Sequence, residues 1–163
     1  MTKKLILILS AVFFSFLSLT AFAAGTKIEY PEQNWSFSGL FGIFDKASAQ
    51  RGYQVYREVC SGCHGMRLIN YRNLSALGYN TEELKALAAE FEVQDGPNDE
   101  GEFFTRPGRP SDKFISPYPN KQAARAANGG SYPPDLSLIV KARSNGANYL
   151  HALLSGYTEP PKG

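Results

Sequence analysis

Two cysteines and a histidine lie within five residues of one another, as Cys60-Ser-Gly-Cys63-His64. They are both cysteines and one of the two histidines of the chain. The C-x-x-C-H spacing is typical of c-type haem attachment. In such a site each thiol forms a thioether with one haem vinyl group, and the adjacent imidazole ligates the iron. The pattern therefore predicts one covalently bound haem c at Cys60, Cys63 and His64, with His64 as the metal ligand.

Two other kinds of site use paired cysteines. A redox dithiol gains from a helix N-terminus, which favours the thiolate, but this pair is predicted to fall late in a helix, where the dipole opposes a thiolate. A structural zinc site normally takes four Cys or His ligands, and His151 lies far from His64 in the sequence. The haem interpretation is favoured over both.

A second iron ligand is harder to assign. His151 lies in a Leu-rich segment, where a histidine is more often a packed or rim residue than a ligand. Met66 follows His64 by two residues and is too close to it to reach the opposite haem face. Neither residue is expected to ligate the iron.

The cysteines must be positioned by a helix that is predicted to begin at Asp45, a good N-cap. Ala49, Tyr53, Tyr56, Cys60 and Cys63 recur at steps of four, three, four and three. That spacing marks one face of a helix. The pattern predicts that both cysteines lie on the buried face.

Further helices are predicted downstream. One begins at Asn80, with Glu83 completing a capping box, and buries Leu84, Leu87, Ala88 and Phe91. Short helices are expected at 121–127, 136–143 and 147–155, with glycines at their ends. Pro133-Pro134 is expected to hold the chain extended, with Asp135 capping the helix at 136–143. No segment alternates convincingly as a strand, so the predicted class is mostly α.

Two segments are expected to be irregular. Residues 25–44 are rich in aromatic residues and glycine and are expected to pack as an extended lead-in on the core. Residues 93–119 form a long polar stretch, far longer than a typical connection of ~4 to 6 residues. This stretch is predicted to be an irregular insertion in a single domain.

The N-terminus has the form of an export signal. Lys3-Lys4 precede an uncharged run from Leu5 to Ala24 that ends in small residues. We expect residues 1–24 to be a signal peptide and residues 25–163 to be the mature domain; an uncleaved membrane anchor is the alternative. The formal net charge of +2 comes from the two lysines of the signal, so overall charge identifies no partner.

From Trp35 to Tyr157 the sequence resembles cytochrome c1, the haem-bearing subunit of the membrane quinol:cytochrome c oxidoreductase (complex III). Several motifs carry the resemblance besides the haem motif, and the most specific is Pro133-Pro-Asp-Leu-Ser137. The others are Trp35-Ser-Phe-x-Gly-x-Phe-Gly-x-Phe-Asp45, Gln50-Arg-Gly-Tyr-Gln-Val-Tyr-x-Glu-Val-Cys60, Ile69-Asn-Tyr-Arg72, Asp95-Gly-Pro-Asn-Asp99, Pro117-Tyr-Pro-Asn120, Ala123-Ala-Arg-x-Ala-Asn128, Lys141-Ala-Arg143 and Leu153-Leu-x-Gly-Tyr157.

The resemblance implies a c-type cytochrome fold with helices around a haem that exposes one edge. It also implies that Asn128, Pro134, Arg143 and Tyr149 line the haem, with Arg143 near a propionate. A buried Arg needs an anion, although a surface Arg at a helix C-terminus is the simpler alternative. In the family, a distal Met ligand and a membrane helix follow the region matching Tyr157, so the chain is expected to be a cytochrome c domain that is incomplete at its C-terminus.

The implied function is one-electron transfer from the iron-sulfur subunit to a cytochrome c in the respiratory chain, with no side-chain catalysis. The implied partners are the cytochrome b and iron-sulfur subunits, cytochrome c and, for the complete protein, the membrane; no nucleic-acid partner is expected. The expected location is the periplasmic face of a bacterial inner membrane or the equivalent intermembrane space. A haem enzyme with an open distal site, of peroxidase type, is the alternative.

Overall fold

A computed structural model describes residues 28–160 of the chain. The predicted signal peptide, residues 1–24, lies outside the described residues. Among the described residues, no helix is both long and apolar enough to span a bilayer.

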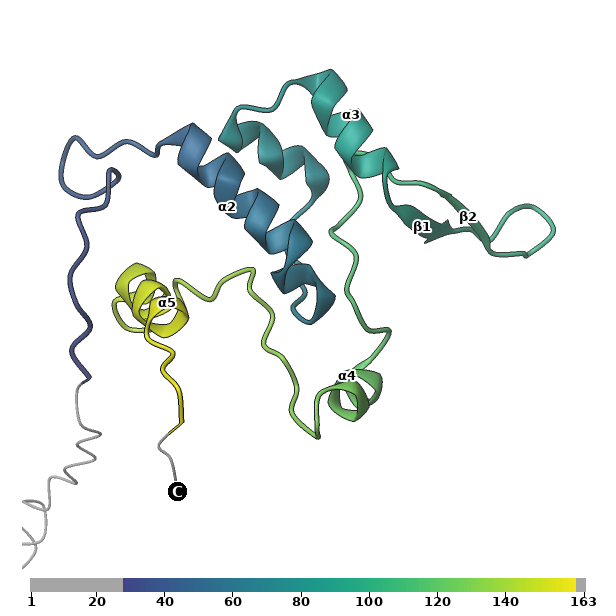
Figure 1. Cartoon of the computed structure of the whole chain (residues 1–163). Coiled ribbons are helices and arrows are strands. Elements are labelled where there is room, and N and C mark those ends of the chain that lie inside the picture. Colours follow the sequence, from purple (N-terminus) through teal and green to yellow (C-terminus); the bar gives the residue numbers. More distant parts are fainter. Residues whose placement is uncertain (1–27, 161–163) are drawn as a thin grey trace, which may run out of the picture.

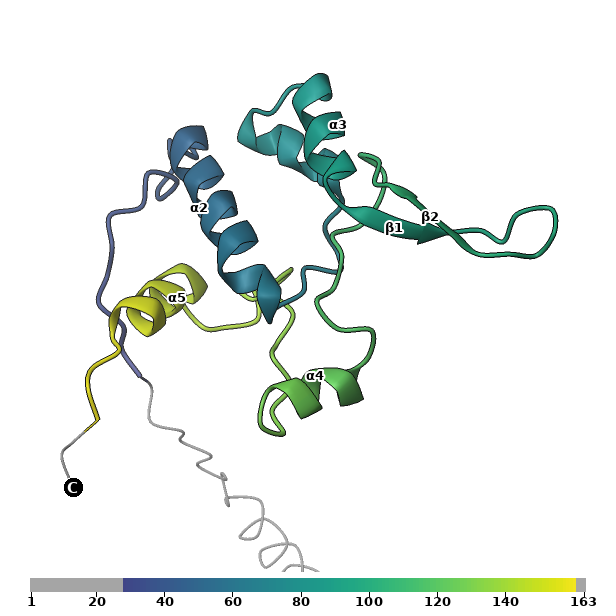
Figure 2. The same ribbon diagram turned by 45° about the vertical axis from the view of Figure 1, so that its right-hand side comes forward.

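Helices are the main regular structure, and a small two-stranded sheet projects from them (Figure 1). The turned view in Figure 2 shows the same projection, with α4 below the other helices and α5 beside the N-terminal lead-in. The elements in chain order are α2 (Lys46–Glu58), the 3-10 helices η1 (Cys60–Gly62) and η2 (Tyr71–Leu77), α3 (Thr81–Ala89), β1 (Glu92–Asp95), β2 (Phe104–Pro107), α4 (Lys121–Ala127) and α5 (Gly146–Ser155).

Helix α2 begins where the sequence predicts but ends before the cysteines. The Asp45 carboxylate accepts hydrogen bonds from the backbone N–H groups of Ala47 and Ser48, at 3.0 and 3.2 Å, which is the expected N-cap. The helix then ends at Glu58, and the chain tightens into η1. The prediction that both cysteines share a buried helix face is wrong, because Cys60 is half-buried and Cys63 is exposed.

The core is an aromatic and aliphatic cluster between α2, η2 and α3. Its buried members are Tyr71, Leu74, Leu84, Ala88 and Phe114. The capping box at the start of α3 is present as predicted, and α3 buries Leu84 and Ala88. Leu87 and Phe91, the other two residues of the predicted face, pack against this cluster while partly buried.

The segment 93–119, predicted to be irregular, contains most of a β-hairpin. β1 and β2 pair antiparallel from Glu92 opposite Pro107 to Asp95 opposite Phe104. Arg106 joins the hairpin to the following loop through ion pairs with Asp95 and, at 2.7 Å, with Asp112. Each strand has only four residues, too few for a clear alternation of polar and apolar side chains, so the sequence gives no strand signal.

The C-terminal part has two of its three predicted helices. α4 spans the predicted range, and α5 begins one residue early, at Gly146. Gly146 fits because an added Cβ would lie only 1.8 Å from the carbonyl oxygen of Val140. The predicted helix at 136–143 is wrong, since this segment forms turns.

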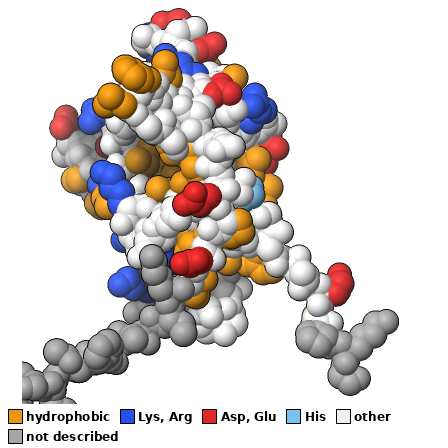
Figure 3. All heavy atoms as spheres, turned by 90° about the vertical axis from the view of Figure 1, so that its left-hand side faces the viewer, with side chains coloured by type: hydrophobic (Ala, Val, Ile, Leu, Met, Phe, Trp, Pro, Cys, Tyr) orange, Lys and Arg blue, Asp and Glu red, His pale blue; other side chains and the backbone are white. Residues whose placement is uncertain are grey.

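The lead-in to α2 packs only in part, contrary to the prediction that residues 25–44 pack on the core. Trp35 is half-buried, and its Nε1 donates a 2.7 Å hydrogen bond to the side chain of Asn148 on α5. Leu40 and Phe41, in contrast, are 90% and 88% exposed. Figure 3 shows hydrophobic and charged side chains interspersed over one face of the molecule, with a histidine beside hydrophobic side chains.

Candidate haem site

The C-x-x-C-H motif forms a tight turn at the end of α2. The backbone N–H groups of Cys63 and His64 both donate to the carbonyl oxygen of Cys60, at 3.1 and 2.8 Å. In a 3-10 turn, residues three apart lie one above the other. The turn therefore places the two free thiols on the same side, which the sequence predicted for a different reason, a continuous α-helix.

His64 is oriented by a residue far away in the sequence. Its Nδ1 lies 2.8 Å from the carbonyl oxygen of Pro134. Since a carbonyl only accepts, Nδ1 carries the proton, and the lone pair of Nε2 is free for a metal. The Tyr56 hydroxyl donates to the backbone carbonyl of His64 at 3.2 Å and so fastens this turn to α2.

Two segments are joined by hydrogen bonds next to the His64 imidazole. We call residues 64–68 the histidine loop and residues 133–137 the proline strap. The backbone N–H of Leu136 donates to the carbonyl of Gly65 at 2.8 Å, and the N–H of Leu68 donates to Ser137 Oγ at 3.1 Å. The strap is extended through the two prolines, as the sequence predicts.

Asp135 is the charged residue of this junction. Burial by itself raises the pKa of its carboxyl, but hydrogen bonds from Arg67 and Ser137 outweigh that effect and lower the pKa to about 2. The sequence predicted that Asp135 caps a helix. It does accept from the N–H of Ser137 at 3.0 Å, but a turn follows instead of a helix.

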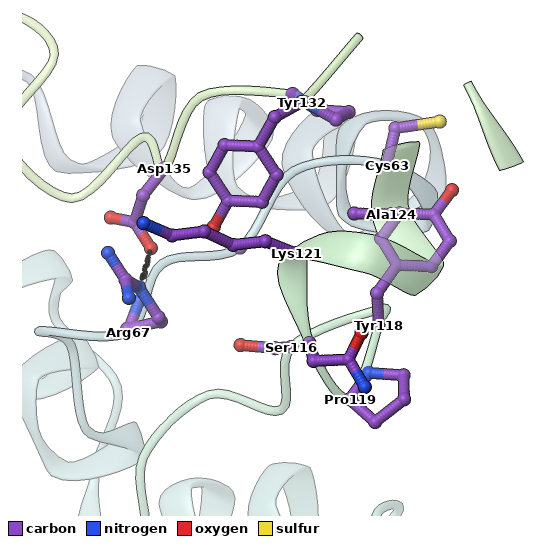
Figure 4. Close-up of a pocket in the computed structure, with 12 residues that line it drawn as sticks. Cys63, Arg67, Ser116, Tyr118, Pro119, Lys121, Ala124, Tyr132 and Asp135 are labelled. Carbon is purple, nitrogen blue, oxygen red and sulfur yellow. Dashed lines mark hydrogen bonds and ion pairs between the residues drawn. The ribbon is translucent and has the colours of Figure 1, made fainter. Parts of the chain in front are cut away.

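A cavity of about 130 Å³ lies next to the motif and is lined by both segments. Figure 4 shows its lining, with the Arg67–Asp135 pair at one end and Tyr132 and Lys121 between that pair and Cys63 in this view. Its lining mixes charged side chains (Arg67, Lys121, Asp135) with aromatic and proline side chains (Tyr118, Pro119, Tyr132, Pro133).

The four residues assigned from the family resemblance lie in different surroundings. Pro134 contacts His64, as described above. The side-chain amide of Asn128 donates to the Tyr118 hydroxyl at 3.1 Å and to the Ala124 carbonyl at 2.7 Å. The guanidinium of Arg143 lies 5.9 Å from the centre of the Tyr149 ring, a cation–π contact. In the structure, Pro134 therefore contacts His64, and Arg143 contacts Tyr149.

Arg143 is exposed, so the argument that a buried guanidinium requires an anion does not apply to it. One of its terminal nitrogens donates to the backbone carbonyl of the preceding Ala142 at 3.1 Å. Its assignment to a haem propionate stays a prediction.

Met66 and His151 both have packing partners. Met66 lies against the core cluster. The ring of His151 meets that of Trp35 edge to face, with 6.0 Å between centroids. His151 is exposed and has this ring contact, which agrees with the packed or rim position that the sequence favours for it.

The residues of the site fit a covalently attached haem. Two free thiols stand one turn apart, and the imidazole beside them presents an unprotonated nitrogen. Exposed apolar side chains flank these groups in the sequence, with Val59 71% and Leu68 60% exposed. Among the described residues, no group of three or more His, Cys, Asp or Glu side chains is placed to hold a metal, so the zinc interpretation gains no support.

Sequence reasoning missed the contacts that hold His64. Tyr56 was assigned only to a helix face, and neither Arg67 nor Asp135 was assigned to the site. The run Pro133-Pro-Asp-Leu-Ser137 was a signal for the strap, but a linear pattern does not show which distant loop a segment contacts.

Comparisons with known proteins identify the family to which this sequence is related. The Cytochrome C1 family model matches residues 35–163. The mitochondrial cytochrome c1-2, heme protein, of Solanum tuberosum is 59% identical over 136 residues, which are 83% of this chain and 52% of that protein. Cytochrome c1 of Rhodospirillum rubrum is 54% identical over 132 residues, 81% of this chain and 48% of that protein.

A third relative is the mitochondrial cytochrome b-c1 complex catalytic subunit of Candida albicans, 53% identical over 142 residues, 86% of this chain and 49% of that protein. The chain spans about half the length of these curated relatives. The family match takes in the C-x-x-C-H turn, the histidine loop and the proline strap. The chain, with the paired thiols and oriented imidazole that this match includes, therefore belongs to the cytochrome c1 family.

Proposed function

We propose that this chain binds one haem c covalently through Cys60 and Cys63, with His64 as an axial iron ligand, and serves as a one-electron carrier. The observation that carries the proposal is the 2.8 Å contact between His64 Nδ1 and the Pro134 carbonyl, next to two free thiols. This contact leaves Nε2 as the nitrogen that binds iron. A redox dithiol has no need of an imidazole oriented in this way.

The chain's own residues attach and orient the cofactor. Cys60 and Cys63 would hold the haem through thioether bonds to its two vinyl groups, and the His64 imidazole would ligate its iron. The bound haem supplies the one-electron chemistry of its iron. The protein sets the reduction potential of the iron through the ligating imidazole, the hydrogen bond to that imidazole and the polarity of the surroundings.

The partners are proposed from the relatives. One relative is named as a subunit of the cytochrome b-c1 complex, which supports a place for this chain in that assembly. We propose that it receives electrons from the iron-sulfur subunit, passes them to a cytochrome c, and contacts the cytochrome b subunit and the membrane. The export-like N-terminus supports a location at the periplasmic face of a bacterial inner membrane or its mitochondrial equivalent.

The peroxidase-type alternative has no support among the described residues or in the names of the relatives. A distal His and Arg pair would be its signature. His151 instead meets the Trp35 ring, and Arg143 lies over Tyr149.

Haem attachment is tested on the exported chain. After precipitation in acidic acetone, the protein should keep its haem and give the spectrum of a c-type haem in alkaline pyridine. Release of all haem into the solvent would contradict covalent attachment. A complete absence of haem would contradict the proposed function as a whole.

A further inference from the structure

Asp135 binds three hydrogen-bond donors with one carboxylate. Its Oδ2 accepts from the backbone N–H of Arg67 at 3.0 Å and from Arg67 Nε at 3.1 Å. Its Oδ1 accepts from the backbone N–H of Ser137 at 3.0 Å. Asp135 therefore joins the histidine loop to the proline strap and also fixes the turn within the strap.

The environment makes this junction stronger than an ordinary surface ion pair. The side chain of Asp135 is only 16% exposed, whereas that of Arg67 is 61% exposed. Two of the three donors are backbone N–H groups, whose positions do not depend on the exposed Arg67 side chain. Removing the carboxylate leaves both N–H groups without this acceptor, which costs more than losing one exposed ion pair.

Pro134 immediately precedes Asp135, so the carboxylate also determines where the Pro134 carbonyl lies. The Pro134 carbonyl belongs to the planar peptide unit that includes the Asp135 nitrogen, so it cannot move independently of the Asp135 backbone. The imidazole of His64 donates its Nδ1 proton to that carbonyl. The position of the His64 ring therefore depends on the Asp135 junction.

We propose that Asp135 is a positioning residue for His64: its carboxylate fastens the proline strap to the histidine loop and so holds the Pro134 carbonyl against the imidazole. The inference deepens the proposed function and rests on it for the consequences at the iron. A hydrogen bond from Nδ1 raises the basicity of a metal-bound imidazole. Because a more basic ligand favours ferric iron, loosening the strap raises the reduction potential.

The test compares the wild-type chain, carrying its haem, with Asp135→Ala and Asp135→Asn. NMR measures the exchange rate of the His64 Nδ1 proton, and a redox titration measures the midpoint potential. In Asp135→Ala the proton should exchange about tenfold faster, as expected when a hydrogen bond is weakened, and the potential should rise. Asp135→Asn should show a smaller change, because its amide oxygen still accepts from one backbone N–H.

Two further variants separate positioning from general stability. Arg67→Gln keeps the backbone donor and should change the His64 signals less than Asp135→Ala does. Asp112→Ala is the matched control, because the Asp112 side chain is also 16% exposed and binds an arginine, Arg106, but at the hairpin. It should lower stability and leave the His64 proton and the potential unchanged.

Unchanged proton exchange and potential in Asp135→Ala would overturn the positioning role, as would equal shifts in Asp112→Ala. A wild-type chain without haem would overturn the proposed function instead. In that case the comparison of His64 proton exchange is made on the haem-free chain. Faster exchange in Asp135→Ala alone then supports the positioning role, and equal rates refute it.

Discussion

At the scale of single residues, the proposed chemistry depends on three side chains and on what holds them. Cys60 and Cys63 differ in exposure, the first half-buried and the second exposed. Neither is paired in a disulfide. Both thiols are thus available for thioether formation, while His64 is constrained by Pro134 through its ring and by Tyr56 through its backbone.

Replacing the cysteines tests the attachment chemistry. Cys60→Ala and Cys63→Ala should each keep haem through one thioether at most, and the double variant should lose all haem to acidic acetone. The measurement is the haem absorbance that remains with the precipitated protein. Ser61→Ala, within the same turn, is the control and should keep covalent haem; covalent haem in the double variant would contradict the assigned positions.

At the scale of elements, polar side chains join segments that lie outside the core cluster. The β-hairpin is tied to the loop that follows it by Arg106, and the N-terminal lead-in is tied to α5 by Asn148. Because both connections are partly or fully buried, breaking either one should lower the free energy of unfolding more than breaking an exposed pair would.

The hairpin connection should be sensitive to acid. The hydrogen bonds from Arg106 hold the pKa of Asp112 below its ordinary value of 3.8, and they also lower that of Asp95, which faces the same guanidinium. A carboxyl whose pKa is lower in the folded state stabilises the fold above its unfolded pKa, and this contribution is lost as the pH falls through the folded pKa.

We therefore expect wild type to be more stable than Asp112→Asn at pH 6, with the difference shrinking as the pH falls below about 4. Urea unfolding at several pH values measures this difference. Asp99→Asn, at the exposed hairpin tip, serves as the control and should change stability little. A difference between wild type and Asp112→Asn that is constant from pH 6 to pH 2 would contradict the assignment.

The connection between the lead-in and α5 depends on one amide. Asn148 is 7% exposed, and its side-chain oxygen accepts from Trp35 Nε1 at 2.7 Å and from the Gln33 backbone N–H at 3.2 Å. Asn148→Ala leaves both donors without this partner and should lower the free energy of unfolding by about 1–3 kcal/mol. Chemical denaturation followed by Trp35 fluorescence measures the loss.

Asn34→Ala is the control for this connection, because Asn34 lies in the same lead-in and is exposed. It should change the free energy of unfolding by less than about 0.5 kcal/mol. Equal stability of wild type and Asn148→Ala would mean that the lead-in is held by its ring contacts alone.

At the scale of the whole molecule, charge is unevenly distributed although the net charge is small. Eight of the fifteen acidic residues lie between residues 82 and 102. Three of them pair with a basic residue, Glu82 with Lys85, Glu90 with Arg57 and Asp95 with Arg106, and Glu83 belongs to the α3 capping box. The other four, Glu92, Asp99, Glu100 and Glu102, are exposed on the projecting hairpin (Figure 1).

This hairpin charge should attract a basic cytochrome c. Long-range attraction raises association rates by ~10 to 1,000-fold and is screened over ~8 Å at physiological salt. Charge reversal of Glu100 and Glu102 to Lys should slow association at low ionic strength and have little effect at high salt. Stopped-flow measurement of electron transfer to a cytochrome c gives the rates.

Charge reversal of Glu29 and Glu32 in the N-terminal lead-in is the matched control, since it changes the net charge by the same amount at exposed positions elsewhere. Equal slowing by both pairs would assign the effect to net charge. Equal rates for wild type and the Glu100/Glu102 variant at low salt would exclude a docking role for the hairpin.

Features that depend on near neighbours were predictable from the sequence. The caps at Asp45 and Asn80 each use donors within three residues, and α4 begins and ends where its flanking residues indicate. The haem motif likewise lies within five residues. Such features form wherever the local sequence allows them. The sequence by itself therefore determined the tight spacing of the two thiols and the imidazole, the starts of the main helices and the extended prolines.

Only the tertiary structure decided what surrounds the motif. The imidazole of His64 meets a carbonyl 70 positions away, and Arg67 meets a carboxylate 68 positions away. The segment 136–143 also depends on a distant partner, because Arg67 binds the carboxylate that was expected to cap a helix there. A linear pattern carries no information about which segments meet in space, and those contacts determine how His64 of this cytochrome c1 family member is held.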